Sequence, residues 1–139
     1  MTIPQLTIFI ENSSGTLSMV LEQMKRSNIQ MIACTIADTA EYGIFRIICT
    51  EPRRAFDCLN DAGIAVALSN VFALELDNHP GGAADVVKVL SDAGIDIAYM
   101  YAFLLDGKGI LVFRTDDEKK AREAIAASKI GYLREENLV

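Results

Sequence analysis

The sequence contains an internal repeat, and this repeat constrains the fold more than any other feature. The chain aligns with itself, without a gap, when it is shifted by 66 residues. Identical residues then meet in these pairs: Asn12 with Asn78, Gly15 with Gly81, Val20 with Val86, Ile29 with Ile95, Gly43 with Gly109, Ile44 with Ile110, Ala55 with Ala121 and Ile64 with Ile130. Because the pairs fall on loop glycines and on core-spaced apolar positions, duplication explains them better than chance. We therefore expect two similar units, over residues 1–69 and 70–139.

Each copy is predicted to have the element order βαββαβ, from runs of apolar residues, helical spacing and turn residues. In the first copy the expected elements are a strand at 5–10, a helix with the stripe Leu17, Val20, Leu21 and Met24 that ends at Asn28, strands at 30–38 and 43–50, a helix at 51–62 and a strand at 64–69. In the second copy they are a strand at 71–77, a helix that ends at Gly94, strands at 96–104 and 109–115, a helix at 117–128 and a strand at 130–134. Pro52 suits the first helical position, and Asp106-Gly107 is typical of a tight hairpin turn.

This order predicts the α+β class, with two ferredoxin-like units whose crossovers are right-handed. The connection between the units is short, since only Ser69-Asn70 separates the last strand of one from the first strand of the other. Two sheets placed side by side would each hide one edge. We therefore expect one continuous eight-stranded antiparallel sheet with the helices on one face.

Composition excludes several classes of protein. The formal net charge is −6, with a sequence pI of about 4.7, so binding to nucleic acid or to an anionic membrane surface is disfavoured. No apolar run approaches the roughly 18 residues that a membrane span needs, and the first residues lack the features of a signal peptide. A cytoplasmic location is expected.

The three cysteines, Cys34, Cys49 and Cys58, do not have the spacing of a metal site. We expect them to be small buried apolar residues, with one reactive or metal-binding thiol as the alternative. His79 is the only histidine, and Gly81-Gly82 is not followed by the Lys-Ser/Thr of a phosphate-binding loop. No catalytic set, metal site or cofactor site is therefore predicted.

Polar, glycine-containing loops join the first strand of each copy to its first helix. Free backbone N–H groups and the helix dipole make such a place suitable for an anion, for example a carboxylate. Side chains of Ser13, Ser14 and Thr16 also suit the N-cap, which is the structural alternative. Capping alone does not explain why an asparagine recurs at Asn12 and Asn78.

The run Asp77-Asn78-His79-Pro80-Gly81, between a predicted strand and a predicted helix, resembles the signature of ACT domains. These domains are small regulatory modules of many enzymes of amino-acid metabolism, and βαββαβ is their topology. The resemblance covers the whole chain as two copies. It implies an amino-acid ligand between the loop after the first strand of one domain and the start of the neighbouring domain's second strand.

By this resemblance, the predicted ligand-binding residues come from both loops and from both second-strand starts. They are Asn12, Ser13, Ser14, Gly15, Thr16, Leu17, Gln30, Met31, Asn78, His79, Pro80, Gly81, Gly82, Asp96 and Ile97.

The chain departs from the serine-sensing module of phosphoglycerate dehydrogenase, which has a second Asn at the strand start where Gln30 and Asp96 stand here. This departure counts against serine as the ligand. A carboxylate at Asp96 suits a ligand ammonium, while the helix start suits the ligand carboxylate. The alternatives are that Asp96 is a solvated acid and that His79 is an exposed, inert side chain. Pro80 makes the second loop the closer match, so the tighter site is expected there.

The leading hypothesis is a regulatory protein that binds a free amino acid at the interface of its two repeats. It would signal by oligomerisation, for example as a homodimer, or through a partner enzyme of amino-acid metabolism. The second hypothesis is a ligand-free assembly module, which predicts an exposed apolar strip on one sheet edge or face. The third is an enzyme on a ferredoxin-like scaffold, which needs convergent ionisable groups in one pocket.

Overall fold

The structure is a computed structural model of the chain that describes residues 1–11, 15–38 and 42–139. The chain divides into two compact units. The first-repeat unit consists of Pro4–Ser69 together with Leu138–Val139, and the second-repeat unit consists of Met1–Ile3 together with Asn70–Asn137.

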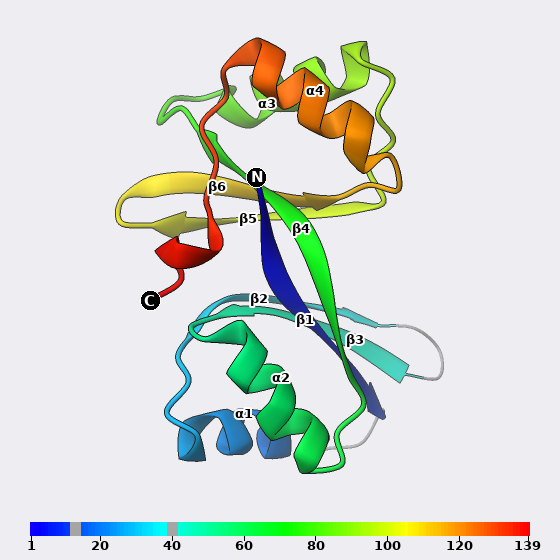
Figure 1. Cartoon of the computed structure of the whole chain (residues 1–139), viewed down its shortest axis with the longest axis vertical. Helices are drawn as coiled ribbons and strands as arrows, with labels where there is room; N and C mark the ends of the chain where they lie inside the picture. The colour runs from blue at the N-terminus through cyan, green and yellow to red at the C-terminus, as the bar shows by residue number, and fades with distance from the viewer. Residues whose placement is uncertain (12–14, 39–41) are drawn as a thin grey trace. The chain divides into compact units, whose positions relative to one another are not determined.

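The first-repeat unit has strands in one layer and helices in another. Its elements are β1 (Thr2–Glu11), α1 (Thr16–Arg26), β2 (Met31–Asp38), β3 (Tyr42–Cys49) and α2 (Pro52–Asp61). β3 lies between β1 and β2 and pairs with both in the antiparallel sense. α1 and α2 cover one face of these strands (Figure 1). The core between the layers includes Leu6 and Phe45 from the strands and Leu59 from α2, all of which are buried.

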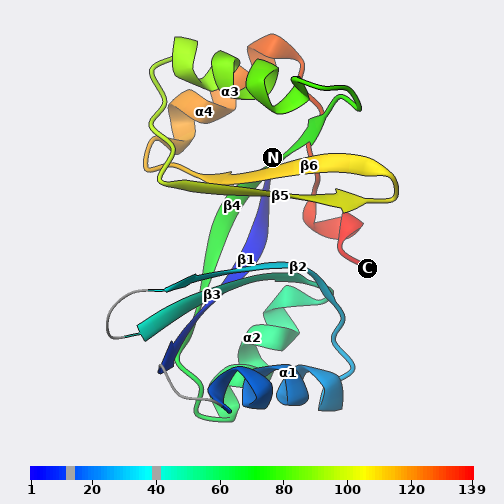
Figure 2. The same cartoon turned by 180° about the vertical axis from the view of Figure 1, so that it is seen from behind.

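The second-repeat unit repeats this arrangement. Its elements are β4 (Val66–Leu76), α3 (Gly82–Asp92), β5 (Tyr99–Leu105), β6 (Lys108–Arg114), α4 (Glu118–Ser128) and a short 3-10 helix (Glu135–Asn137). β6 pairs with β4 and β5, again antiparallel. Figure 2 shows α3 and α4 on one face of the β5–β6 hairpin. Phe72 and Phe113 stack in the core, with ring centroids 5.0 Å apart.

The predicted number of strands is wrong. The described part of the chain has six strands, in the order β2-β3-β1-β4-β6-β5, instead of the eight expected. The predicted strands 64–69 and 71–77 are one strand, β4, which runs through Ser69-Asn70 without a break. Ser69 and Asn70 favour a loop, but the turn propensity of two residues is weak, and strand pairing on both sides of them outweighs it.

The other difference concerns the predicted strand 130–134, which is reduced to an isolated antiparallel bridge between Leu74 and Tyr132. Two backbone bonds support it: Glu75 N–H donates to the Gly131 carbonyl, and Leu133 N–H donates to the Ala73 carbonyl. The chain then enters the 3-10 helix, so the ladder is not extended.

Several local predictions are confirmed. Asn28 and Gly94, one residue beyond the C-caps of α1 and α3, have φ values of 55° and 74°, as a left-handed helix ending requires. Pro52 occupies the first turn of α2. Asp106 and Gly107 both have positive φ, the conformation of a type I′ hairpin turn.

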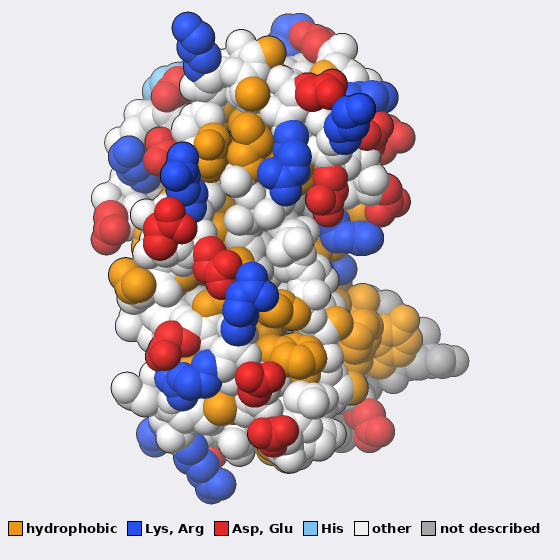
Figure 3. Space-filling view, in the orientation of Figure 1, with side chains coloured by type: hydrophobic (Ala, Val, Ile, Leu, Met, Phe, Trp, Pro, Cys, Tyr) orange, Lys and Arg blue, Asp and Glu red, His pale blue; other side chains and the backbone are white. Residues whose placement is uncertain are grey.

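The surface is mixed in character. Acidic and basic side chains are interspersed on the face shown in Figure 3, with hydrophobic side chains between them. Phe9 and Tyr42 are nearly half exposed and meet edge to face, with ring centroids 6.4 Å apart. None of the helices in the described ranges has the length and apolarity that crossing a bilayer requires.

Candidate functional site

The start of β2 contributes to a cleft of about 660 Å³ in the first-repeat unit, which we call the first strand cleft. The cleft lies where the C-terminal part of α1, the start of β2 and the β3–α2 connection meet. Its apolar lining comes from Leu21, Met24, Ile29, Met31 and Val139. Gln30 also lines it, so both strand-start residues predicted in the first copy face one cleft.

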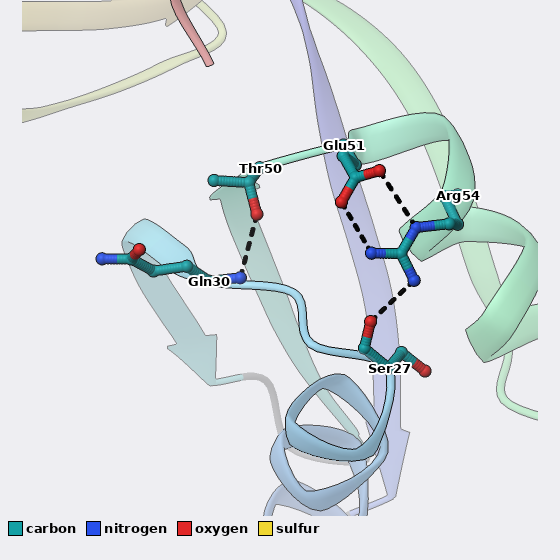
Figure 4. A network of polar contacts seen from close by, with 5 residues as sticks. All are labelled: Ser27, Gln30, Thr50, Glu51 and Arg54. Atoms are coloured by element: carbon teal, nitrogen blue, oxygen red, sulfur yellow. Dashed lines mark hydrogen bonds and ion pairs between the residues drawn. The ribbon is translucent and has the colours of Figure 1, made fainter. Parts of the chain in front are cut away.

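A hydrogen-bond network fixes the polar wall of this cleft (Figure 4). The Arg54 guanidinium donates to both carboxylate oxygens of Glu51, at 3.2 and 2.6 Å, and to the Ser27 carbonyl at 2.6 Å. Gln30 N–H donates to Thr50 Oγ1, and Thr50 N–H donates to the Gln30 carbonyl, both at 2.9 Å. The hydrogen bond from Arg54 lowers the pKa of Glu51. These hydrogen bonds hold the start of β2 against the β3–α2 connection, and the Glu51 carboxylate stays charged and is paired with Arg54.

The equivalent place in the second-repeat unit is a smaller cleft of about 300 Å³, which we call the second strand cleft. Asp96 and Ile97 line it, at the positions of Gln30 and Met31. Its other charged lining residues are Asp116, Asp117 and Lys120. Lys120 Nζ lies 3.4 Å from Asp117 Oδ2. Asp116 is paired with Arg114 at 3.1 Å, so Asp96 is the carboxylate of this lining that has no described ion pair. The predicted strand 96–104 begins only at Tyr99, so Asp96 lies in the connection before β5.

A further cleft, of about 280 Å³, lies between the end of β4, the start of α3 and the chain after α4. We call it the helix-start cleft. Gly82 is the one predicted site residue among its described lining. Its charged lining residues are Glu75, Asp77, Asp85 and Lys129. The side chains of Asp77 and Asp85 were not among the predicted ligand contacts, because β4, the loop and α3 bring them together only in the fold.

The start of α3 is shaped by two glycines. Gly81 is the N-cap and has a φ of 92°, a conformation that favours glycine. A Cβ at buried Gly82 would lie 2.5 Å from the Asp77 carbonyl oxygen, so the loop backbone approaches the helix closely there. No side chain caps α3. The positive end of its dipole is therefore left to the loop and to solvent.

The loop before α3 is exposed at Asn78, His79 and Pro80. His79 N–H donates to the Asp77 carbonyl at 2.9 Å, which closes a tight turn. His79 Nδ1 lies 2.8 Å from the Pro80 carbonyl oxygen, and this hydrogen bond raises the pKa of His79, with a smaller contribution from the Asp77 carboxylate. The loop thus presents its amide and imidazole to solvent at the helix start.

The corresponding loop of the first copy is only partly described. Asn12, Ser13 and Ser14 lie outside the described residues. Gly15 is the N-cap of α1 and Thr16 is the first residue of the helix, while Ser13 and Ser14, the other residues of the predicted cap, lie outside the described residues. Leu17 is half-buried against the first-repeat core, a structural position.

In the second copy, the predicted loop residue Gly82 and the strand-start residues Asp96 and Ile97 do not share a cleft. α3 separates them, and a helix of 11 residues is about 16 Å long. Gly82 therefore lines the helix-start cleft, whereas Asp96 and Ile97 line the second strand cleft. In the second copy, the predicted ligand site is therefore divided between two separate clefts.

Of the three cysteines expected to be buried, only Cys49 is fully buried. Cys49 is buried as predicted, and burial raises the pKa of its thiol to about 12. Cys58 is half-buried, and Cys34 is exposed on the edge strand β2. Among the described residues, no cluster of His, Cys, Asp and Glu could hold a metal ion.

Comparison with known proteins gave a family match over the whole chain and matches to solved structures. A family model described as an ACT domain pair matches residues 1–139. The crystal structure of protein BT0572 from Bacteroides thetaiotaomicron is 36% identical, covers 96% of this chain and 92% of its own, and has a TM-score of 0.89. No functionally curated protein matches.

Two more distant structures share the fold. The regulatory subunit of aspartate kinase from Thermus thermophilus, in a ligand-free form, has a TM-score of 0.61 at 12% identity, over 89% of this chain and 91% of its own. The regulatory subunit of aspartate kinase from Thermus flavus has a TM-score of 0.57 at 13% identity, over 89% of this chain and 90% of its own.

Proposed function

The chain belongs to the ACT domain pair family, and from this premise we propose that it is a regulatory protein that binds a free amino acid. The match of the family model to the whole chain carries the proposal. The shared fold of two aspartate kinase regulatory subunits supports a regulatory role. In this proposal residues 1–69 and 70–139 are the two ACT domains, and neither catalyses a reaction.

The tighter ligand site is assigned to the loop before α3. An amino acid at neutral pH carries one carboxylate and one ammonium group. The uncapped start of α3 suits the carboxylate, and the Asn78 amide lies in the loop beside it. The acids of the helix-start cleft, Glu75, Asp77 and Asp85, suit the ammonium.

The remaining predicted residues complete the proposal. The loop of the first copy, from Asn12 to Leu17, is the equivalent ligand loop. The strand-start residues Gln30, Met31, Asp96 and Ile97 supply the second half of each site, as the ACT resemblance implies. The bound ligand alters association with a second copy or with an enzyme of amino-acid metabolism.

Calorimetry with the twenty common amino acids tests this proposal on the full chain. At least one amino acid should release or take up heat and raise the melting temperature. Asn78→Ala should weaken that binding about tenfold, as expected for one lost hydrogen bond to a charged group. Asn60→Ala, at an exposed position near the end of α2, is the matched control and should bind normally.

Two results would contradict the proposal. One is the absence of heat and of thermal shift with every amino acid. The other is unchanged affinity in both Asn78→Ala and Asp85→Asn, which would show that the helix-start region does not hold the ligand.

A ligand-free assembly module is the second candidate function, and one observation favours it. β5 is an edge strand, and it carries Met100 and Leu104, which are 50% and 75% exposed. An exposed apolar row on a sheet edge is the feature that this alternative predicts.

A further inference from the structure

The first strand cleft contains one positive charge that no acid compensates. Lys25 and Glu51 are the charged residues of its described lining. Arg54 donates hydrogen bonds to both carboxylate oxygens of Glu51, at 3.2 and 2.6 Å. Lys25 has no ion pair in the described part of the chain. The ammonium of Lys25 therefore stands beside the apolar wall of this cleft without a counter-charge.

The end of α1 does not need this ammonium as a cap. A lysine in the last turn of a helix often donates to the terminal carbonyls. Here the carbonyls of Gln23, Met24 and Lys25 already accept N–H groups from the backbone that follows the helix. The Ser27 carbonyl accepts a hydrogen bond from Arg54. Capping of these carbonyls thus leaves the Lys25 ammonium available to the cleft.

The equivalent positions of the second copy have the opposite charge. Ser91 stands at the position of Lys25, and Asp96 stands at the position of Gln30. The second strand cleft has thus lost a cation and gained an acid at matched places in the repeat. It is also smaller, at about 300 Å³ against about 660 Å³. A preference for an anion is therefore expected in the first strand cleft and not in the second.

The size and the neutral polar groups of the first strand cleft suit a small ligand. Its volume lies within the range of roughly 300–1,000 Å³ that is usual for small-molecule sites. Asn28 and Gln30 add two side-chain amides to the lining. Figure 4 shows the Gln30 side chain directed away from the Glu51–Arg54 pair. Both amides can donate to a carboxylate, so the cleft combines one cation and two neutral donors with an apolar wall.

A strained backbone position also distinguishes this cleft from its copy. Glu51 has a φ of 45°, a left-handed conformation that is uncommon outside glycine, and it stands directly before Pro52. The equivalent Asp117 has a φ of −102°. Strained residues persist where the surrounding structure holds them, and they gather at ligand sites. The strain at Glu51, which the pair with Arg54 holds in place, adds to the case for a ligand here.

We propose that the first strand cleft binds an organic monocarboxylate that has an aliphatic body and no ammonium group. The carboxylate pairs with Lys25, and the aliphatic body lies against the apolar wall. An ammonium group on the ligand would have to compete with Arg54 for Glu51, the acid of this lining. The inference goes beyond the proposed function, in which a zwitterion is held at the loop before α3. It shares Gln30 and Met31 with the proposed amino-acid sites, so its test uses a different ligand.

NMR of the full chain with isotope-labelled methionine methyl groups tests the proposal, with isocaproate as the probe. Met24 and Met31 line the cleft, whereas Met100 lies on β5 in the second-repeat unit. Isocaproate should shift the methyl signals of Met24 and Met31 and leave that of Met100 unchanged. Two matched probes keep the same carbon skeleton. Leucine adds an ammonium group and isohexyl alcohol lacks the carboxylate, so each should bind this cleft about tenfold more weakly.

Three variants test the role of the Lys25 charge. Lys25→Gln should weaken isocaproate binding about tenfold, as expected for one lost hydrogen bond between charged groups. Lys25→Arg keeps the charge and should restore most of the affinity. Arg26→Gln is the matched control, because Arg26 pairs with Glu22 and is not part of the described lining. It should bind isocaproate normally, and amide spectra that match the wild type verify the fold of each variant.

Three results would overturn the proposal: no shift of the Met24 and Met31 methyl signals with isocaproate, unchanged affinity in a folded Lys25→Gln variant, or leucine binding in this cleft as tightly as isocaproate. Failure here and failure of the proposed function remain distinguishable, because the ligands and the measurements differ. Missing methyl shifts with isocaproate do not alter the calorimetry with amino acids. Missing heat with every amino acid, in turn, does not alter the methyl shifts with isocaproate.

Discussion

The two repeats keep the same backbone at both ends of their first helices but use different side chains there. Gly15 and Gly81 both have positive φ at the helix starts, and Asn28 and Gly94 both have positive φ after the helix ends. The chain path is thus preserved where a left-handed residue is needed. The side chains beside these turns differ between the copies, so the two repeats share a backbone path but not the charged and polar groups around it.

The strand clefts show this difference most clearly. In the first repeat, Arg54 reaches across to the Ser27 carbonyl and so ties the end of α1 to the start of α2. In the second repeat, the equivalent residue Lys120 contacts Asp117 at the start of its own helix. Asp96, facing the same cleft, has no ion-pair partner among the described residues. The first strand cleft thus has a hydrogen bond from α2 to the end of α1, whereas the second strand cleft has an acid without a described ion pair.

The largest difference in stability is expected at the helix starts. Thr16 in α1 and Gly82 in α3 are equivalent positions. Gly82→Ala places a Cβ against the Asp77 carbonyl, and we expect a loss of about 2 kcal/mol in the free energy of unfolding, as for other overpacked sites. Urea unfolding measures it. Thr16→Ala is the control and should cost no more than about 1 kcal/mol; equal losses at the two positions would contradict the close approach at Gly82.

A smaller effect is expected from the cations of the strand clefts. Arg54→Ala removes the bond to the Ser27 carbonyl as well as the pair with Glu51, so amide hydrogen exchange at the end of α1 should become faster. Lys120 Nζ pairs with Asp117 at its own helix start and only packs near Gly94, without a described hydrogen bond to the end of α3. Lys120→Ala should therefore change exchange at the end of α3 less than Arg54→Ala changes it at the end of α1. If amide exchange at the end of the preceding helix speeds up equally in both variants, the proposed difference between Arg54 and Lys120 is wrong.

The smallest effect concerns His79, which has Ser13 at the equivalent position in the first copy. An NMR titration of the His79 imidazole should give a pKa above 6.5, mainly because of the hydrogen bond to the Pro80 carbonyl. Asp77→Asn should remove only part of the increase. Because the folded pKa is raised, the stabilising contribution is present at low pH and is lost as the pH rises through the folded pKa. A pKa at or below 6.5 would contradict the described loop geometry.

Local signals predicted much of this fold. The αL endings at Asn28 and Gly94 and the hairpin turn at Asp106-Gly107 depend on near neighbours in the sequence, and the repeat supports the same assignment in both copies. The continuous strand β4 was missed because its pairing partners, distant in the sequence, outweigh the turn propensity of Ser69-Asn70.

The candidate site was predicted in outline only. The loop motif identified Gly82 and the exposed Asn78. It gave no sign of Glu75 and Asp85, because three elements must pack before these acids line one cleft. The strand start of the second copy is separated from its loop by α3, a helix that the apolar spacing predicts, so the two parts could be expected to lie apart.

The unbroken strand β4 has a consequence for how such a chain evolves. Residues 66–69 of this strand belong to the first-repeat unit and residues 70–76 to the second. A recombination breakpoint at the repeat boundary would divide a strand at its middle and leave each product with an incomplete sheet. A breakpoint in the turn at Gly63 would instead keep the strand whole. The pair is therefore expected to be inherited and transferred as a single genetic module, although it arose by doubling.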